Sequence, residues 1–159
     1  MTQDLAARLA DRWYEECEQR QLATDPYHAL RQGLQDFLPV DAKAGIAYRD
    51  DSPFVLALAT GALLLFAPPT VGKLVDVVAL PVSSLRSLSV SCEHTSGMHA
   101  NYRVCTWGMT DDQGVARSHV TRSVVGNGFD SDNGGEGVML ALADRMGWST
   151  PISSAASPG

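Results

Sequence analysis

The spacing of apolar residues changes twice along this 159-residue chain, and these changes constrain the fold more than any other feature. Up to about residue 40, apolar side chains recur every three or four residues, which is the period of an amphipathic helix. From Ala44 onward they recur at every second position, which is the period of strands with one buried face. After a glycine-rich stretch, the helical period returns over 136–146. The sequence therefore predicts an α+β protein with two helices, a run of strands and a final helix.

The first forty residues predict a helical hairpin. The first helix has an apolar stripe made of Leu5, Leu9, Trp13 and Cys17. The second has a stripe made of Tyr27, Leu30, Leu34 and Phe37 or Leu38. Asp25 followed by Pro26 indicates the start of the second helix, with Asp25 as its N-cap. Because a hairpin with one apolar side is not stable alone in water, residues 1–43 are expected to pack on the rest of the chain.

The alternating segment predicts seven strands. They are expected over 44–48, 54–59, 62–67, 74–80, 85–93, 101–109 and 115–125. The apolar stretch 54–67 contains 14 residues, whereas a membrane-spanning helix needs about 20. Thr60 and Gly61 interrupt this stretch, so two buried strands joined by a tight turn explain it better. A later turn is expected over 94–98, and the small, polar residues 149–159 are expected to form a disordered tail.

The alternation also predicts which side chains face the core. In the sixth and seventh strands, the residues expected inward are Cys105, Trp107, Met109, Ala116, Val120 and Val124. The outer, polar face is expected to carry Ser87, Ser89, Tyr102, Thr106, Arg117, His119 and Thr121. In this register Arg122 points into the core. That misfit indicates either a β-bulge or a register that is off by one residue.

The charge of the chain indicates which partners it binds, and its cysteine content indicates where in the cell it is located. The formal net charge is −6, and no basic block is present, which disfavours nucleic acid and anionic membranes as partners. Cys17, Cys92 and Cys105 form an odd set without a tight motif, so we expect reduced thiols in a cytosol. The N-terminus has no basic segment followed by an apolar one, so no signal peptide is expected and a cytoplasmic location is predicted.

One cluster of metal-capable residues stands out. Cys92, His94, His99 and Cys105 lie within fourteen positions of one another. Zinc prefers thiolate and imidazole ligands in a closed tetrahedron, with wider spacing inside each ligand pair than is found here. Two core cysteines beside a solvated loop explain the pattern better, so no metal and no cofactor is expected. No nucleophile elbow or other catalytic constellation is present in the sequence, which predicts a protein that is not an enzyme.

Residues 53–148 resemble the small bacterial pleckstrin-homology-like (PH-like) domains. Three segments carry the resemblance: the apolar hairpin 56–65, the stretch 78–88 with its proline and small polar residues, and the amphipathic helix 136–146. The resemblance implies a bent antiparallel barrel or sandwich of about seven strands, capped by the C-terminal helix. Family members that bind phosphoinositides do so with basic residues around the first hairpin turn. Here Ala62 and Leu63 follow that turn, so lipid headgroup binding is not expected.

The resemblance and the missing catalytic signals together predict a non-enzymatic, cytoplasmic protein-interaction or scaffolding module. Its domains are expected at 1–43 (helical hairpin), 44–148 (PH-like domain) and 149–159 (tail). The candidate partner-binding residues are Tyr102, Arg117, His119, Trp13 and Tyr14. The expected partner is another protein or a second copy of the chain. Two alternatives stay open: a small metal-dependent or hydrolytic enzyme using Cys92, His94, His99 and Cys105, and peripheral membrane binding.

Overall fold

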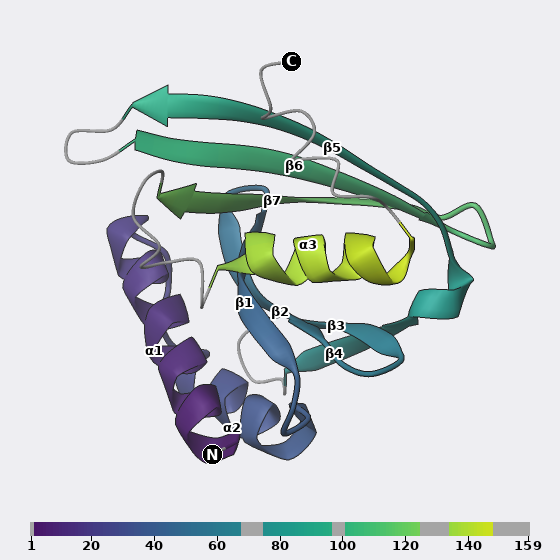
Figure 1. Ribbon diagram of the computed structural model, residues 1–159. Coiled ribbons are helices and arrows are strands. Elements are labelled where there is room, and N and C mark those ends of the chain that lie inside the picture. The colour runs from purple at the N-terminus through teal and green to yellow at the C-terminus, as the bar shows by residue number, and fades with distance from the viewer. Residues whose placement is uncertain (1, 68–74, 97–100, 125–133, 148–159) are drawn as a thin grey trace.

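The structure, a computed structural model, describes residues 2–67, 75–96, 101–124 and 134–147. Three α-helices, seven strands and a short 3-10 helix follow one another within them (Figure 1). The helices are α1 (Thr2–Gln19), α2 (Tyr27–Phe37) and α3 (Gly135–Arg145). The strands are β1 (Lys43–Arg49), β2 (Ser52–Leu58), β3 (Ala62–Ala67), β4 (Asp76–Pro81), β5 (Leu85–Ser96), β6 (Asn101–Asp111) and β7 (Ala116–Val124), with the 3-10 helix Val82–Ser84 between β4 and β5. This order confirms the one expected from the apolar periods.

All seven strands belong to one antiparallel sheet, in the order β4-β3-β2-β1-β7-β6-β5. Four strands form one half and three form the other, and the halves meet where β1 pairs with β7 at Tyr48 and Val120. The sheet is bent, with α3 lying between its two halves (Figure 1). The predicted α+β class and bent antiparallel sheet are confirmed. The sheet is not closed into a barrel, and β4 and β5 are its edges.

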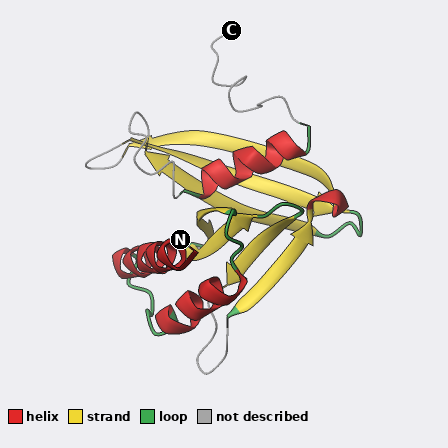
Figure 2. Cartoon of the chain, turned by 60° about the horizontal axis from the view of Figure 1, so that its bottom comes forward, coloured by secondary structure: helices red, strands yellow, loops and turns green. Residues whose placement is uncertain are grey.

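Two apolar cores lie on opposite faces of β1–β3. On one face, α1 and α2 pack their stripes against the sheet, with Leu9, Trp13 and Leu34 buried. On the other face, β2 and β3 pack against α3, β5 and β6, with Trp107 and Leu142 fully buried. Figure 2 shows α1 and α2 together on one side of these strands and α3 on the other. The hairpin of helices therefore extends the core of the sheet, as its one-sided apolar pattern requires.

The second helix starts differently from the prediction. Pro26, not Asp25, is the N-cap residue of α2, and no side chain caps this end. At the other end, Leu38 is buried whereas Phe37 is 60% exposed. The stripe therefore continues through Leu38, and Phe37 faces solvent.

The strand boundaries agree closely with the predicted ones except near the β5–β6 turn. β5 continues to Ser96, so the turn expected over 94–98 begins too early. The apolar stretch 54–67 forms β2 and β3, as predicted. The tail expected over 149–159 lies outside the described residues.

Helix α3 is fixed at both ends. Gly134 forms an isolated bridge with Ile46, and a Cβ on Gly135 would lie only 2.7 Å from the Ile46 carbonyl oxygen. The absence of a side chain at this position lets the helix approach β1 closely. At the C-terminal end, Arg145 donates hydrogen bonds to the carbonyl oxygens of Ala59 and Thr60. Glu136 is thereby placed in the first turn of the helix, close to β6 and β7.

Candidate functional site

An open hollow of about 490 Å³ lies on the helical hairpin. It is lined by Asp11, Tyr14, Glu15, Glu18 and Tyr27. Asp11 is followed by Tyr14 and Glu15 after three and four positions, and Glu18 follows them after four and three, so the four residues share one side of α1. Tyr27, the first residue of α2, closes the hollow from the second helix. The hollow therefore combines three carboxyl groups with two phenol rings.

The two tyrosines are held by each other and by a carboxylate. Their rings meet edge to face, with centroids 5.7 Å apart. The Tyr27 hydroxyl donates a hydrogen bond to Asp11 Oδ1, and this bond raises the pKa of Tyr27, while nearby Arg31 acts in the opposite direction. Tyr14 is 36% exposed. This hollow thus presents aromatic surface beside negative charge.

Trp13 and Tyr14, adjacent in sequence, have different surroundings. Trp13 is 2% exposed, and its indole nitrogen donates a hydrogen bond of 3.0 Å to the carbonyl oxygen of Pro53. This bond fixes α1 against the start of β2. Of the two residues predicted to meet a partner from this helix, only Tyr14 is at the surface.

The other three predicted partner-binding residues are not brought together. Tyr102 is on the outer face of β6, where the Arg122 guanidinium lies 4.4 Å from the centre of its ring. Arg117 is partly buried and forms an ion pair of 3.1 Å with Asp111. His119 is 2% exposed, so the prediction that it faces outward is wrong.

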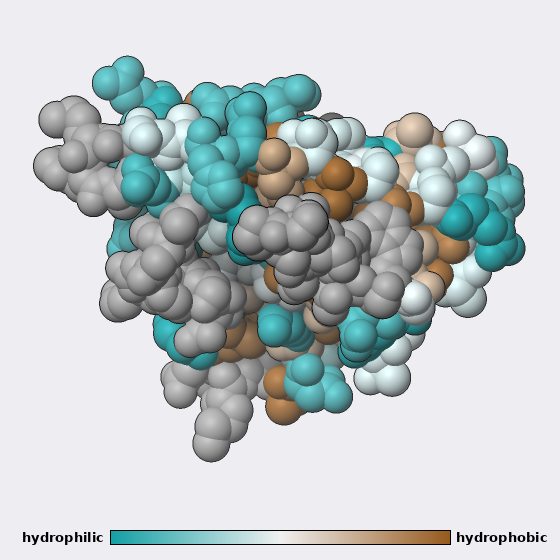
Figure 3. All heavy atoms as spheres, turned by 45° about the horizontal axis from the view of Figure 1, so that its top comes forward, coloured by the Kyte–Doolittle hydropathy of each residue, from teal (hydrophilic) through white to brown (hydrophobic). Residues whose placement is uncertain are grey.

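The reason for this error is the orientation of β7. Its pairing with β6 is regular from Ala116 to Val124, so the strand has no bulge there, and the register was off by one. The inner face carries Thr121, which is fully buried, while Arg122 lies outside over the Tyr102 ring. The expected exposure of Ser87, Ser89 and Thr106 is correct. Figure 3 views the molecule from the side of β5 and β6, where white and teal surfaces prevail among the coloured residues and brown ones occupy smaller areas.

His119 is buried without a partner for one of its nitrogens. Its Nε2 atom has no hydrogen bond within the described part of the chain. The ring meets Phe54 edge to face at 5.9 Å. Burial, with a smaller contribution from the positive charge of Arg49, lowers the pKa of His119 to about 4. The side chain is therefore neutral at physiological pH.

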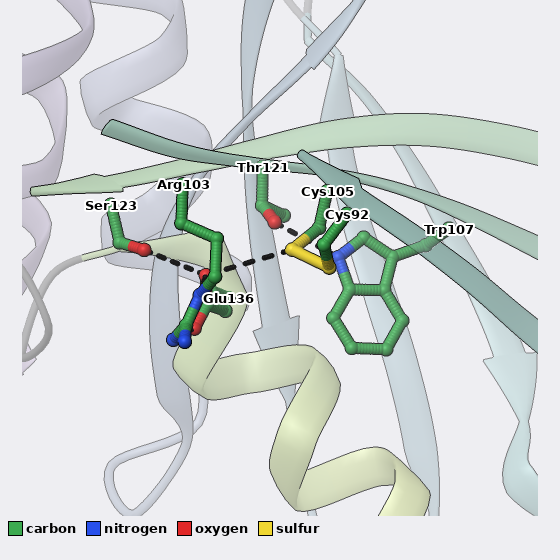
Figure 4. A network of polar contacts seen from close by, with 7 residues as sticks. All are labelled: Cys92, Arg103, Cys105, Trp107, Thr121, Ser123 and Glu136. Atoms are coloured by element: carbon green, nitrogen blue, oxygen red, sulfur yellow. Dashed lines mark hydrogen bonds and ion pairs between the residues drawn. A yellow bond between two sulfur atoms is a disulfide. The ribbon is translucent and has the colours of Figure 1, made fainter. Parts of the chain in front are cut away.

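A second polar group lies on the inner face of the sheet, at the start of α3 (Figure 4). Glu136 is 5% exposed and accepts hydrogen bonds from both Nε and a terminal nitrogen of Arg103. The Ser123 hydroxyl donates a further bond of 2.6 Å to Glu136 Oε2. Nearby, Trp107 Nε1 donates to Thr121 Oγ1 at 2.8 Å. These hydrogen bonds to residues that are distant in sequence explain how the polar side chains of β7 are accommodated inside the fold.

Cys92 and Cys105 form a disulfide, so the expectation of reduced thiols is wrong for these two residues. They are directly opposite one another on β5 and β6. Cys105 is fully buried, as predicted, whereas Cys92 is exposed. Cys105 Sγ lies 3.9 Å from Glu136 Oε2. The third cysteine, Cys17, is free and buried, and burial raises its pKa to about 11.

The candidate metal cluster does not form a ligand set. Its two sulfur atoms are bonded to each other and do not act as thiolate ligands. His94 is exposed on β5, directly across from Arg103, and His99 lies outside the described residues. Within the described ranges, no group of three or more His, Cys, Asp or Glu side chains is arranged to hold a metal ion.

Comparison with protein-family models, curated proteins and solved structures finds no match to this chain. Among the helices of the described segments, none has the length and apolar character needed to cross a membrane.

Proposed function

We propose that this protein is a non-enzymatic interaction module that binds a basic segment of a protein partner in the hollow between α1 and α2. The single observation that carries the proposal is the composition of that hollow: Asp11, Glu15 and Glu18 line it together with Tyr14, which is 36% exposed. A partner Arg or Lys would find carboxylates for its charge and an aromatic face for a cation–π contact. Such complementarity speeds encounter and selects partners by charge.

The architecture supports a PH-like assignment as part of this proposal. The resemblance implies a bent antiparallel arrangement of about seven strands followed by a helix, and the chain has seven such strands in a bent sheet followed by α3, although the sheet is not closed into a barrel. The helical hairpin lies outside the part of the chain that carries the resemblance, and it supplies all the residues that line the hollow. We therefore propose that the hairpin adds the recognition surface to a PH-like scaffold. The cytoplasmic location stays a proposal that rests on the N-terminal sequence alone, because the Cys92–Cys105 disulfide removes the argument from reduced thiols.

The test uses a fluorescently labelled peptide of alternating Arg and Ala residues, with its Arg-to-Gln counterpart as a neutral control. Binding is measured by fluorescence anisotropy. We expect the basic peptide alone to bind, with an affinity that falls when salt is raised from about 50 to about 300 mM, because the hollow is open to solvent.

Variants locate the binding. Glu15→Gln combined with Glu18→Gln should weaken binding of the basic peptide about fivefold at low salt, because each exposed ion pair contributes about 0.5 kcal/mol. Tyr14→Ala should also weaken it, whereas Tyr14→Phe keeps the aromatic face and should not. Asp41→Asn, an exposed carboxylate outside the hollow, is the matched control. Equal loss in the control and the double variant, or no binding at all, would refute the proposal.

A further inference from the structure

We propose that the Cys92–Cys105 disulfide is a thiol–disulfide exchange site, which reacts with a dithiol at Cys92 and uses Glu136 to handle the proton of Cys105. The site is built from β5, β6 and the first turn of α3. It shares no residue with the hollow between α1 and α2. The two proposals are therefore independent of each other.

The first observation is the unequal access to the two sulfur-bearing residues. Cys92 lies on β5, an edge strand of the sheet, and is exposed. Cys105 lies on the neighbouring strand and has no exposed surface. Thiol–disulfide exchange requires a thiolate to reach one sulfur of the bond, and exposure governs that access. An incoming thiolate is therefore directed to Cys92, and Cys105 is the sulfur that leaves.

The second observation is a carboxylate placed beside the leaving sulfur. Glu136 Oε2 lies 3.9 Å from Cys105 Sγ, as Figure 4 shows. A disulfide sulfur carries no hydrogen, so in the oxidised protein this contact is not a hydrogen bond. After reduction, the Cys105 thiol has a hydrogen-bond acceptor in place. Arg103 and Ser123 hold Glu136 in this position.

The reaction balances with a dithiol as the reductant. One thiolate of the dithiol attacks Cys92 Sγ and forms a mixed disulfide. The bond to Cys105 breaks, and its electron pair goes to Cys105 Sγ, which takes a proton from the medium by way of Glu136. The second thiolate of the dithiol then attacks the first sulfur of the dithiol, which is bonded to Cys92 in the mixed disulfide. This attack releases Cys92. The dithiol becomes a disulfide, and two electrons and two protons have passed to the protein.

In the reverse direction, the Cys92 thiolate attacks a disulfide oxidant. Cys105 then resolves the mixed disulfide, and Glu136 accepts the proton that Cys105 must lose to attack. Cys17 does not take part, because it is buried and its raised pKa keeps it protonated. A Cys17→Ser background therefore removes the third thiol from every measurement without removing a member of the proposed site.

The first experiment asks whether the folded protein reacts. In the Cys17→Ser background, dithiothreitol is added at neutral pH, and free thiols are alkylated and counted by mass spectrometry. We expect reduction at least about tenfold faster than global unfolding, which is measured by fluorescence under the same conditions, because Cys92 is an exposed residue that the dithiol can reach in the native state. Reduction no faster than unfolding would identify a purely structural disulfide and overturn the proposal.

The second experiment identifies the reacting sulfur. Cys105→Ser and Cys92→Ser, each in the same background, are incubated with oxidised glutathione. We expect the adduct to form on Cys92 of the first variant at least about tenfold faster than on Cys105 of the second, because only Cys92 is accessible. Equal rates would overturn the assignment. Circular dichroism shows whether both variants are folded. Rates of adduct formation measured in urea, where the chain is unfolded, show how fast each cysteine reacts when both are equally accessible.

The third experiment tests the carboxylate. In the chain with both Cys92 and Cys105, the release of glutathione from the mixed disulfide reports the attack by Cys105. Glu136→Gln should slow this release, because an amide cannot take the proton that Cys105 loses. Glu93→Gln, an exposed residue next to Cys92 in sequence, is the matched control and should not slow it. If both variants release glutathione at the rate of the parent, Glu136 has no role in the proton transfer.

Discussion

The buried imidazole of His119 gives the sharpest test of the packing between the two halves of the sheet. In the folded state its pKa is about 4, against an ordinary value of 6.5. As the pH falls below about 6.5, the unfolded chain takes up a proton on this histidine while the folded protein does not. The unfolded state is therefore favoured, and stability that is present above pH 6.5 is lost as the pH falls toward 4.

The size of the effect follows from the two pKa values. Each pKa unit corresponds to about 1.4 kcal/mol, so His119 alone should lower the free energy of unfolding by about 2 kcal/mol at pH 5 and about 3 kcal/mol at pH 4. Among the residues that the structure describes, the other groups with shifted pKa values act outside this window. Asp111 has a pKa lowered from 3.8, and the shifts at Cys17, Tyr27 and Tyr48 are upward from alkaline values.

The assay is urea unfolding followed by tryptophan fluorescence, at several pH values between about 7.5 and about 5. The parent should lose about 2 kcal/mol over this range, and His119→Leu should lose little, because leucine fills similar space and takes up no proton. His28→Leu, at an exposed position on α2, should keep the loss seen in the parent. The reasoning is refuted if His119→Leu shows the full loss, or if the parent shows none.

Two further predictions concern close packing. Gly135→Ala should destabilise the protein by about 1–3 kcal/mol, because the new Cβ would meet the Ile46 carbonyl oxygen at 2.7 Å, whereas Gly61→Ala, with nothing within 4 Å, should change stability by less than about 0.5 kcal/mol. Trp13→Phe should cost about 1–3 kcal/mol, because the carbonyl of Pro53 loses its buried donor. Urea unfolding measures both effects. A destabilised Gly61→Ala, or a neutral Trp13→Phe, would show that these contacts do not hold the elements together.

Most of the fold could be predicted because its signals are local. The stripe through Leu9, Trp13 and Cys17 has the helical period whatever the helix packs against, and all three residues are buried. The continuous apolar runs of β2 and β3 and the alternation of β6 are likewise visible within a few residues of sequence. By contrast, the N-cap of α2 was predicted from Asp25 and Pro26 alone. The backbone begins the helix one residue later, without a side-chain cap.

The face of β7 could not be predicted from alternation because its buried residues are polar. Thr121 is buried because it accepts a hydrogen bond from Trp107, and Ser123 lies inside because it reaches Glu136, which is distant in sequence. On the other face, the apolar Val120 packs against the core under α1 and α2. The polarity of its residues therefore predicts the wrong buried face for β7, because the hydrogen-bond partners that allow Thr121 and Ser123 to lie inside are distant in sequence.

The disulfide was missed for a geometric reason. The expected strands 85–93 and 101–109, paired end to end, would place Cys92 opposite Tyr102, whereas the observed pairing of Ser96 with Asn101 places Cys92 opposite Cys105. An error of about two residues in the position of the turn is thus enough to hide that the two cysteines lie opposite one another and can form a disulfide. The hollow was missed for a related reason. The acidic residues of α1 look like an ordinary solvated face, and Tyr27, which closes the hollow, belongs to another element.

The division of the protein into two cores has a consequence for its synthesis. Every fully buried member of the core beneath α1 and α2 precedes residue 67, so this half can assemble while the ribosome is still adding the later strands. The cover of the opposite face of the same strands is incomplete until Leu142 emerges, close to the end of the chain. During that interval Leu56, Leu63 and their neighbours present an uncovered apolar surface. Nascent chains stalled before residue 134 should therefore be the ones that chaperones retain.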